Sequence, residues 1–314
     1  MATATSIILH HYSASPYAEK IRLALRLKNL AWSSVDIPMM MPKPDLTALT
    51  GGYRKTPVMQ IGADIYCDTN LILDELETRF KLPTLALPGH EGLSDMVSAW
   101  AADWFQQSVS IIFAALVDVM PAEFVEDRRA MAGGTLDVDG MKLSAPMVKD
   151  QWRSNLNMLE QRLIGAQITG AGDFMIGAKP GLVDIHAHFN IWWMGQAQPD
   201  FLAACLQSTP HVKDWFDRIS DHKGQSPEPL SAEEAIDIAL SAAPRLKPAS
   251  TSGELRDIQP GETVAVAPSD SGRDWVEGDL VIANAQRVII ARQDERAGNL
   301  HVHFPRVGYY LRRV

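Results

Sequence analysis

The chain has 314 residues, of which 46% are hydrophobic, and carries a formal net charge of −9. This length predicts a globular protein of two or three domains with a sizeable core. The longest apolar stretch, around residues 109–117, is too short to cross a bilayer, and residues 1–11 lack the basic segment of a signal peptide. We therefore expect a cytoplasmic protein and no membrane partner.

The negative charge lies mainly in the middle of the chain. Residues 83–248 contain 12 basic and 21 acidic residues, whereas the two flanking regions are close to neutral. No basic face stands out, so we do not expect nucleic acid or an anionic membrane surface as the main partner.

The first functional signal is a Ser-Pro-Tyr-Ala step at residues 15–18. It follows a short apolar run at residues 6–9 and precedes an amphipathic segment at residues 20–26, so we expect a strand, a tight loop and a helix. The hydroxyl of Ser15 then lies at a helix N-terminus, where unpaired N–H groups favour an anion such as a thiolate. A structural cap fits equally well, because Ser is a preferred N-cap and Pro a preferred first helical residue.

A proline opens the next apolar run, at residues 57–61. Pro57 cannot donate to a sheet ladder, so it belongs at the start of a strand or in a turn. A cis bond there would leave the backbone of Thr56 and Val58 free to pair with an extended peptide. Lys55, just before this segment, could meet a carboxylate of that peptide.

Asp68 and Thr69 precede a helical segment at residues 71–77. They either cap this helix or, with its free N–H groups, receive a carboxylate. Taken singly, each of these residues also fits a purely structural role.

In this order and spacing the residues resemble the glutathione transferase superfamily. The resemblance covers a thioredoxin-like domain over about residues 6–82 and, more loosely, the helical region behind it. In that family the residue matching Ser15 activates the sulfur of glutathione, the residue before the cis-proline pairs with the cysteinyl backbone, and an acidic residue followed by Ser or Thr receives the γ-glutamyl group. The glutathione site implied by the resemblance consists of Ser15, Lys55, Thr56, Pro57, Val58, Asp68 and Thr69.

Serine at position 15 determines which chemistry the resemblance implies. Omega-like members with a similar loop carry Cys there, form a mixed disulfide with glutathione and act as thiol reductases, which Ser15 cannot do. A hydroxyl can only donate to the sulfur, and with the helix end it shifts a thiol of pKa about 8.5 toward the thiolate. The resemblance thus implies a homodimeric, detoxifying glutathione S-transferase that joins glutathione, its co-substrate, to a small hydrophobic electrophile. The alternative is a non-catalytic relative that binds a ligand or a protein.

Residues 83–247 are expected to form an all-helical domain, because apolar residues recur at helical spacing in two long segments. Trp100 and Trp104 lie one turn apart, and such an aromatic stripe is usually core. In transferases of this kind the corresponding helix faces the electrophile pocket. Trp104 and Phe105 are therefore pocket candidates, together with Met40 from an earlier loop.

Residues 135–143 alternate apolar and polar residues about the pair Asp139-Gly140. This pattern predicts a hairpin. The alternative is an ordinary solvated loop.

Two His-x-His pairs raise the question of a metal site. His186 and His188 fall in a helical segment, where residues two apart point in different directions, whereas His301 and His303 fall in a strand-like run, where they share a face. A metal site needs three or four ligands, and no third ligand is evident nearby. We therefore expect no metal.

The end of the chain changes to a β-type pattern. A capping box at residues 231–234 opens a last helix, and a linker rich in Pro, Ser, Thr and Gly follows at residues 244–253. Short β-type runs then occur at residues 263–267, 280–284, 288–291 and 300–304. They predict a small antiparallel, barrel-like unit that resembles a domain appended in a bacterial and fungal subset of the same superfamily. We expect it to fold separately, as a structural addition or a subunit contact.

The expected fold therefore has three parts. An α/β thioredoxin-like domain spans residues 1–82, an all-α domain spans residues 83–247, and a small all-β domain spans residues 254–314.

Overall fold

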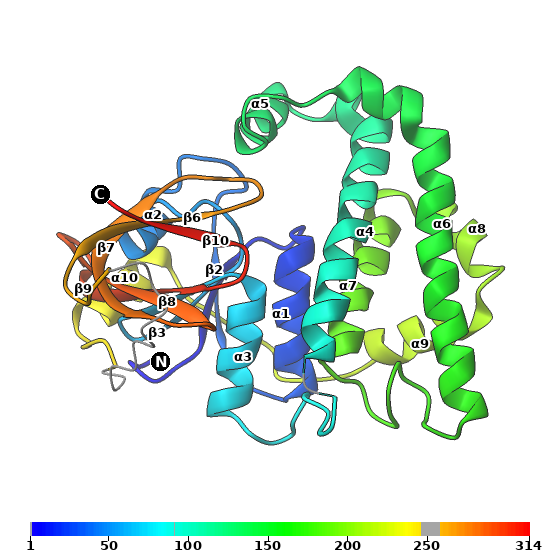
Figure 1. Ribbon diagram of the computed structural model, residues 1–314, viewed down its shortest axis with the longest axis horizontal. Helices are drawn as coiled ribbons and strands as arrows, with labels where there is room; N and C mark the ends of the chain where they lie inside the picture. The colour runs from blue at the N-terminus through cyan, green and yellow to red at the C-terminus, as the bar shows by residue number, and fades with distance from the viewer. Residues whose placement is uncertain (1, 91, 246–257) are drawn as a thin grey trace.

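A β-sheet and a bundle of long helices lie side by side in the computed structural model, which describes residues 2–90, 92–245 and 258–314 (Figure 1). Among these residues, ten strands form one sheet in the order β10-β6-β7-β8-β9-β4-β3-β1-β2-β5. The strands of both chain ends therefore belong to the same sheet.

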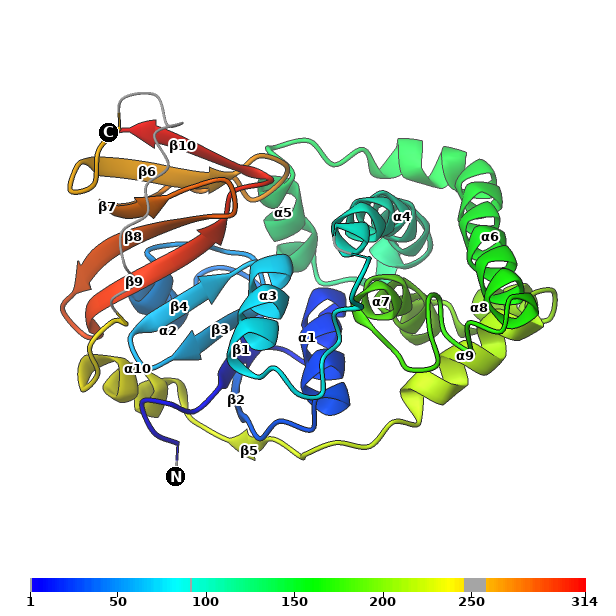
Figure 2. The same ribbon diagram turned by 60° about the horizontal axis from the view of Figure 1, so that its bottom comes forward.

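The N-terminal part forms the β-α-β-α-β-β-α order expected of a thioredoxin-like domain. Its elements are β1 (Ile8–His11), α1 (Pro16–Leu27), β2 (Ser33–Asp36), α2 (Pro44–Thr50), β3 (Val58–Ile61), β4 (Asp64–Cys67) and α3 (Thr69–Arg79). Strand β1 pairs parallel with β2 and antiparallel with β3, which pairs antiparallel with β4. Helices α1 and α3 lie between this sheet and the helical bundle, whereas α2 covers the other face (Figure 2).

The middle of the chain is helical, as predicted. Its elements are α4 (Leu93–Leu116), a 3-10 turn η1 (Val117–Val119), α5 (Ala122–Met131), α6 (Val138–Ile168), α7 (Leu182–Ala197), α8 (Pro199–Leu206) and α9 (Pro210–Ser220). Helix α4 packs against α6 and α7, and α7 packs against α1. In the described part of the chain, no helix is both long enough and apolar enough to span a membrane.

The segment after α9 returns to the sheet. Strand β5 (Glu228–Pro229) pairs with β2, and α10 (Ala232–Leu240) packs against α2. The capping box of α10 is confirmed, because Ser231 Oγ accepts from the Glu234 N–H at 3.1 Å and Glu234 Oε2 accepts from the Ser231 N–H at 2.9 Å.

The predicted hairpin at residues 135–143 is wrong, because α6 begins at Val138. Asp137 is its N-cap: Oδ1 accepts from the Gly140 N–H at 2.9 Å. The pair Asp139-Gly140 therefore lies in the first helical turn. An Asp cap two residues earlier competes with the turn signal, and the later turns of α6 bury Trp152 and Leu156 against the bundle.

The all-β character of the C-terminal part is confirmed. Its strands are β6 (Thr263–Pro268), β7 (Val276–Ala283), β8 (Arg287–Asp294), β9 (Gly298–Pro305) and β10 (Tyr309–Arg313). They pair antiparallel in the order β10-β6-β7-β8-β9. Strands β9 and β10 lie at opposite ends of this run, yet only residues 306–308 connect them. The run of strands must therefore curl so that its two ends approach each other. Pairing of β9 with β10 is not among the ladders of the described residues, and a closed barrel stays a prediction.

Strand β9 joins this run to the N-terminal sheet. It pairs parallel with β4, with Asp64 opposite His301 and Tyr66 opposite His303. One hydrophobic cluster accordingly combines Val58 and Ile65 of the N-terminal strands with Leu300 and Phe304 of β9. Residues 246–253 of the predicted linker and the predicted domain start at residue 254 lie outside the described residues.

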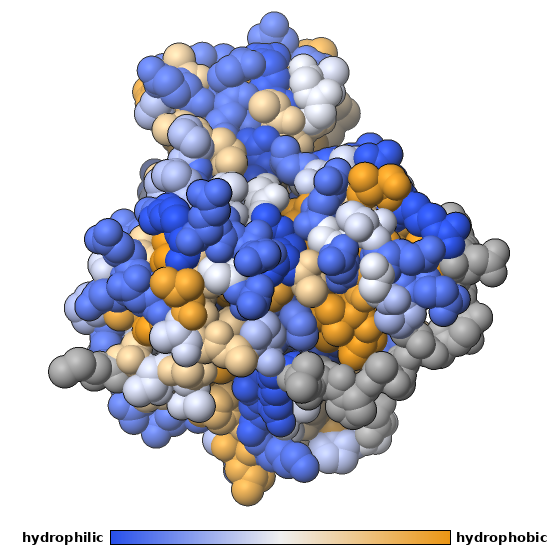
Figure 3. Space-filling view, turned by 90° about the vertical axis from the view of Figure 1, so that its left-hand side faces the viewer, coloured by the Kyte–Doolittle hydropathy of each residue, from blue (hydrophilic) through white to orange (hydrophobic). Residues whose placement is uncertain are grey.

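The side of the molecule that carries the C-terminal strands has a mixed surface. Hydrophilic residues cover much of it, with apolar groups between them (Figure 3). A subunit contact through this side therefore stays a prediction.

Candidate functional site

Ser15 lies between β1 and α1 and is 2% exposed. Its Oγ accepts a hydrogen bond from the Ala18 N–H at 3.2 Å, and Pro16 occupies the first turn of α1. The predicted cap is therefore present. Because Oγ accepts in this bond, the hydroxyl proton of Ser15 can be donated to another group.

The peptide bond between Thr56 and Pro57 is cis, and Val58 begins β3. A buried lysine that the sequence analysis did not identify holds this segment. Lys43 Nζ donates to Thr56 Oγ1 at 3.1 Å and to the Arg54 carbonyl at 3.2 Å. Burial lowers the pKa of Lys43 to about 8, and the charge of nearby Arg128 acts in the same direction.

Asp68 is the N-cap of α3, with a left-handed φ of 80°, and its Oδ1 accepts from the Asn70 N–H at 2.9 Å. Thr69 Oγ1 accepts from Lys20 Nζ at 3.2 Å. Lys20 belongs to α1, and burial lowers its pKa to about 8 against the opposing effect of the Asp68 charge. Lys20 thus connects the helix that Ser15 caps to the N-terminus of α3.

Residues from the C-terminal part of the chain, Tyr309 of β10 and Asp270 between β6 and β7, contact two of the predicted site residues. The Tyr309 hydroxyl donates to Asp68 Oδ2 at 3.1 Å. Lys55 Nζ forms an ion pair with Asp270 Oδ1 at 2.5 Å, and the Asp270 side chain is 67% exposed. The lysine that could meet a ligand carboxylate is thus paired with a carboxylate of the chain itself.

The three pocket candidates differ in burial. Trp104 is fully buried between Trp100 and Trp152, with ring centroids 5.2 Å from each, which favours the core role. Phe105 is half-buried, and its ring contacts Tyr17 at 4.8 Å and stacks on Trp193 at 5.0 Å. Met40 is half-buried in the loop after β2. Phe105 and Met40 therefore stay candidates.

The two His-x-His pairs lie on a helix, α7, and on a strand, β9, as the sequence predicted, but the expectation that no third ligand lies near them is wrong for the second pair. His301 and His303 lie on β9 beside Asp64 of β4, which supplies the third group that the sequence analysis did not find. His303 Nε2 lies 2.8 Å from Asp64 Oδ1, whereas His301 Nδ1 is 3.9 Å away. Asp64 also accepts from the Arg245 N–H at 2.9 Å. These contacts pair the buried carboxylate of Asp64 within the chain.

Family and structure comparisons relate this fold to known proteins. Residues 9–84 match the N-terminal domain of glutathione S-transferases, and residues 142–223 match the C-terminal domain. The crystal structure of a GST-like protein from Pseudomonas syringae is 36% identical in sequence with a TM-score of 0.77, and the match covers 99% of this chain and 100% of that chain. The chain belongs to the glutathione S-transferase superfamily.

More distant superfamily members share the fold alone. A Tau class glutathione S-transferase from mango, Mangifera indica, is 15% identical with a TM-score of 0.52, over 69% of this chain and 89% of that chain. A glutathione S-transferase from Rhodospirillum rubrum F11 is 16% identical with a TM-score of 0.50, over 68% of this chain and 88% of that chain. A search among curated proteins gave no match. Superfamily membership supports glutathione as the ligand.

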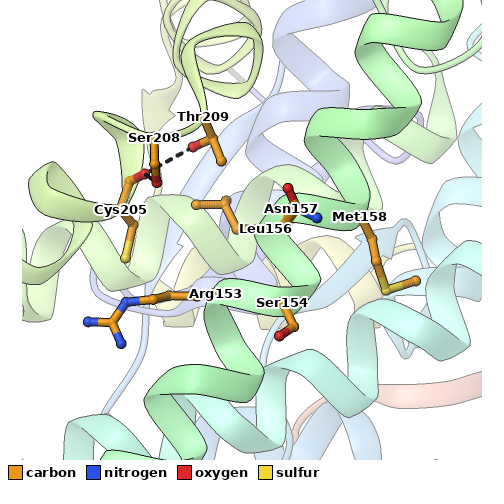
Figure 4. Close-up of a pocket in the computed structure, with 8 residues that line it drawn as sticks. All are labelled: Arg153, Ser154, Leu156, Asn157, Met158, Cys205, Ser208 and Thr209. Atoms are coloured by element: carbon orange, nitrogen blue, oxygen red, sulfur yellow. Dashed lines mark hydrogen bonds between the residues drawn. The ribbon is translucent and has the colours of Figure 1, made fainter.

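A surface depression of this glutathione S-transferase homologue shares no lining residue with the candidate site (Figure 4). Residues of α6 and of the end of α8 line it: Arg153, Ser154, Leu156, Asn157, Met158, Cys205, Ser208 and Thr209. The hydroxyls of Ser208 and Thr209 donate to the Cys205 carbonyl at 2.8 and 3.2 Å, which closes the end of α8. Burial raises the pKa of the Cys205 thiol, which disfavours a reactive thiolate.

Lys20, Tyr309 and Asp270, which were missed from the sequence, fall into two groups. Lys20 had a local signal, because it lies on the face of α1 that buries Leu23 and Ala24 and therefore needs a polar partner. Tyr309 and Asp270 had none, because they meet Asp68 and Lys55 across 241 and 215 positions of the chain.

Proposed function

We propose that this protein is a glutathione transferase in which Ser15 stabilises the thiolate of bound glutathione for attack on a small hydrophobic electrophile. The observation that carries the proposal is the buried hydroxyl of Ser15 at the N-terminus of α1, with a proton that it can donate. A thiolate there would accept that hydrogen bond and gain from the positive end of the α1 dipole. Both interactions favour the charged sulfur, so both lower the pKa of the thiol.

The remaining predicted residues would bind the rest of glutathione. Asp68, at the N-terminus of α3, carries a carboxylate that can accept from the γ-glutamyl ammonium group. The N–H groups of α3 and the hydroxyl of Thr69 suit the γ-glutamyl carboxylate. The backbone of Thr56 and Val58, on either side of Pro57, would pair with the cysteinyl residue, and Lys55 would meet the glycyl carboxylate.

The reaction needs no group beyond these side chains and the two substrates. The thiol proton leaves to solvent, and a sulfur lone pair forms the new bond to the electrophilic carbon. The displaced electron pair leaves with the leaving group, or moves out of an activated double bond onto a carbon that then takes up a proton from solvent. Phe105 and Met40 would line the apolar part of the pocket that binds the electrophile.

The test combines calorimetric titration with glutathione and turnover of 1-chloro-2,4-dinitrobenzene. The Ser15→Ala variant removes both the cap and the sulfur donor. We expect it to raise the pKa of bound glutathione, measured by ultraviolet absorbance of the thiolate, and to lower turnover by about ten- to a hundredfold, because a hydrogen bond to a charged group contributes about 1.5–3 kcal/mol. Much of the glutathione affinity should remain.

Two further variants separate activation from folding. Ser15→Asp keeps an N-cap acceptor but loses the donor, so it should fold normally and still lose activity. Ser13→Ala removes an exposed hydroxyl of the same loop and should leave activity unchanged. Unchanged rates in folded Ser15→Ala and Ser15→Asp would reject the catalytic role and leave Ser15 as a cap alone.

One observation favours the alternative of a non-catalytic ligand- or protein-binding relative. Asp270 pairs with Lys55 and so competes with the glycyl carboxylate of glutathione. Binding without turnover of any electrophile in a panel would support this alternative.

The proposal also includes a cytoplasmic homodimer that acts in detoxification, without a metal and without nucleic acid as a partner. Light scattering on the purified chain checks the assembly, and metal analysis of the same sample checks the absence of a metal.

A further inference from the structure

A tyrosine from the last strand contacts the carboxylate that is expected to bind the γ-glutamyl end of glutathione. The Tyr309 hydroxyl donates to Asp68 Oδ2 at 3.1 Å, while Asp68 Oδ1 accepts from the Asn70 N–H at 2.9 Å. Both oxygens of Asp68 are therefore oriented by the protein. Each oxygen keeps a further lone pair that a ligand N–H group can use.

Parallel pairing of β4 and β9 explains why these two residues meet. In a parallel pair the carboxyl ends of both strands lie at the same edge of the sheet. Asp68 directly follows β4, and Tyr309 follows β9 after residues 306–308. The pairing of β9 with β4 thus places Tyr309 beside the N-terminus of α3.

The ring of Tyr309 is held in place by aromatic neighbours. Tyr309 is 5% exposed, and its ring centroid lies 5.7 Å from that of Phe304 and 6.4 Å from that of Tyr53. The Tyr53 and Tyr309 hydroxyls are 2.9 Å apart. Because the Tyr309 proton is donated to Asp68, Tyr53 donates to Tyr309, and the three groups form a chain of hydrogen bonds.

Burial keeps both tyrosines in the form that donates. It raises the pKa of Tyr309 and of Tyr53 well above the ordinary value of a phenol, and the charge of Asp68 acts in the same direction. A buried, protonated hydroxyl is a fixed donor, so it restricts the Asp68 carboxylate to one orientation.

We propose that Tyr309 is a positioning residue for recognition of the γ-glutamyl ammonium group: it holds Asp68 in the orientation that accepts from this group. The inference rests on the proposed function. It makes the C-terminal strands part of the glutathione site, in place of a structural addition alone.

The test uses the full-length chain and two ligands. One ligand is glutathione, and the other is its analogue without the α-amino group of the γ-glutamyl residue. We expect Tyr309→Phe to weaken glutathione binding about three- to tenfold in calorimetry, since the hydrogen bond that orients Asp68 is lost while Asp68 itself can still accept from the ligand. Binding of the analogue should not change, because it has no ammonium group for Asp68 to accept from. If Tyr309 had only a structural role, Tyr309→Phe would weaken the binding of both ligands equally or would change the binding of neither.

Two further variants test whether the effect is specific to Tyr309 and whether Tyr309 acts through Asp68. Tyr310→Phe alters the adjacent, 53% exposed tyrosine of β10 and should bind both ligands as the wild type does. The double variant of Tyr309→Phe with Asp68→Asn should bind glutathione no more weakly than Asp68→Asn alone, because Tyr309 acts through Asp68. Tyr53→Phe removes the hydrogen bond that Tyr53 donates to Tyr309, and so tests the same chain of hydrogen bonds. It replaces Tyr309→Phe if the Tyr309→Phe variant does not fold.

The outcomes separate this inference from the proposed function. If the wild type does not bind glutathione, the proposed function fails and the inference fails with it. If the wild type binds and folded Tyr309→Phe binds equally well, or if the two substitutions weaken binding additively, only the inference is overturned. A loss confined to glutathione, absent in Tyr310→Phe and in the analogue, supports it.

Discussion

Ser15 and Asp68 each occupy an N-cap and a candidate ligand position at the same time. Ser15 Oγ accepts from the Ala18 N–H, and Asp68 Oδ1 accepts from the Asn70 N–H. The structural and functional interpretations of these residues are compatible, because a cap uses one acceptor site. The proton of Ser15 and the remaining acceptor capacity of Asp68 stay available to a ligand.

Trp104 and Phe105 are neighbours in α4, yet their alanine variants should differ. Trp104→Ala removes a fully buried ring between Trp100 and Trp152, so we expect the free energy of unfolding in urea to fall by about 3–5 kcal/mol. Phe105→Ala removes a half-buried ring, so we expect a smaller loss of stability.

The same pair also tests the electrophile pocket. Phe105→Ala should raise KM for an aromatic electrophile while KM for glutathione stays close to that of the wild type. An unchanged KM for the electrophile would remove Phe105 from the pocket.

At the scale of elements, β9 couples the two ends of the chain. It covers the edge of β4, and Phe304 of β9 is fully buried with its ring centroid 5.9 Å from that of Tyr53. The N-terminal sheet and the C-terminal strands therefore share one hydrophobic core, whereas the sequence predicted that the C-terminal strands fold separately. The shared core implies one cooperative transition for the N-terminal sheet and the C-terminal strands.

A chain truncated after residue 247 tests this coupling. Truncation exposes the β4 edge and the apolar face that Leu300 and Phe304 cover, and an exposed edge strand promotes aggregation. We expect poor solubility, or a melting temperature lowered by roughly 10 °C. A C-terminal unit that folds separately would leave both properties unchanged.

Phe304→Ala in the full-length chain provides the milder version of the same test. It should lower the stability of the whole unit in a single transition. A truncated chain that is soluble and melts like the full-length protein would restore the separate-domain prediction.

At the scale of the whole molecule, buried histidines couple stability to pH. His10 in β1 bonds to Gln60 Oε1 at 2.8 Å, and burial lowers the pKa of its imidazole to about 4. His188 in α7 stacks on Phe216 with ring centroids 4.8 Å apart, and burial lowers its pKa to about 3. The unfolded chain binds these protons near pH 6.5, so at lower pH it holds more protons than the folded chain. The free energy of unfolding therefore falls as the pH is lowered from about 6.5 toward about 4.

His188→Phe should weaken this dependence on pH. Loss of one such histidine is expected to reduce the slope of the free energy of unfolding by up to about 1.4 kcal/mol per pH unit in that range, measured by urea titrations at several pH values. His188→Phe also removes the contact between His188 Nε2 and Ser220 Oγ at 3.3 Å. This loss lowers the free energy of unfolding by the same amount at every pH, so it does not change the slope of that free energy against pH. His222→Gln, at an exposed histidine, is the matched control. The same slope in His188→Phe as in the wild type would contradict the buried-histidine account.

The sequence by itself determined the features that depend on near neighbours. The caps at Ser15, Asp68 and Ser231 were readable because each cap bonds to an N–H group two or three residues later. Strand-like runs near the end of the chain were readable from their short, β-type composition, and the order of Ser15, Thr56-Pro57 and Asp68-Thr69 led to the family. Where two local signals competed, at Asp137 and Asp139-Gly140, packing of the later turns of α6 decided for the helix.

Only the tertiary structure decided which distant residues meet. It brought Tyr309 to Asp68, Asp270 to Lys55 and Asp64 to His303, across 241, 215 and 239 positions of the chain. Each contact follows from the place of β9 beside β4 and from the curl of the C-terminal strands. A strand pattern predicts that a segment will pair, but the backbone groups on every strand edge are alike. The choice of β4 as the partner of β9 therefore depends on how all the buried faces pack together, which no local stretch of residues encodes.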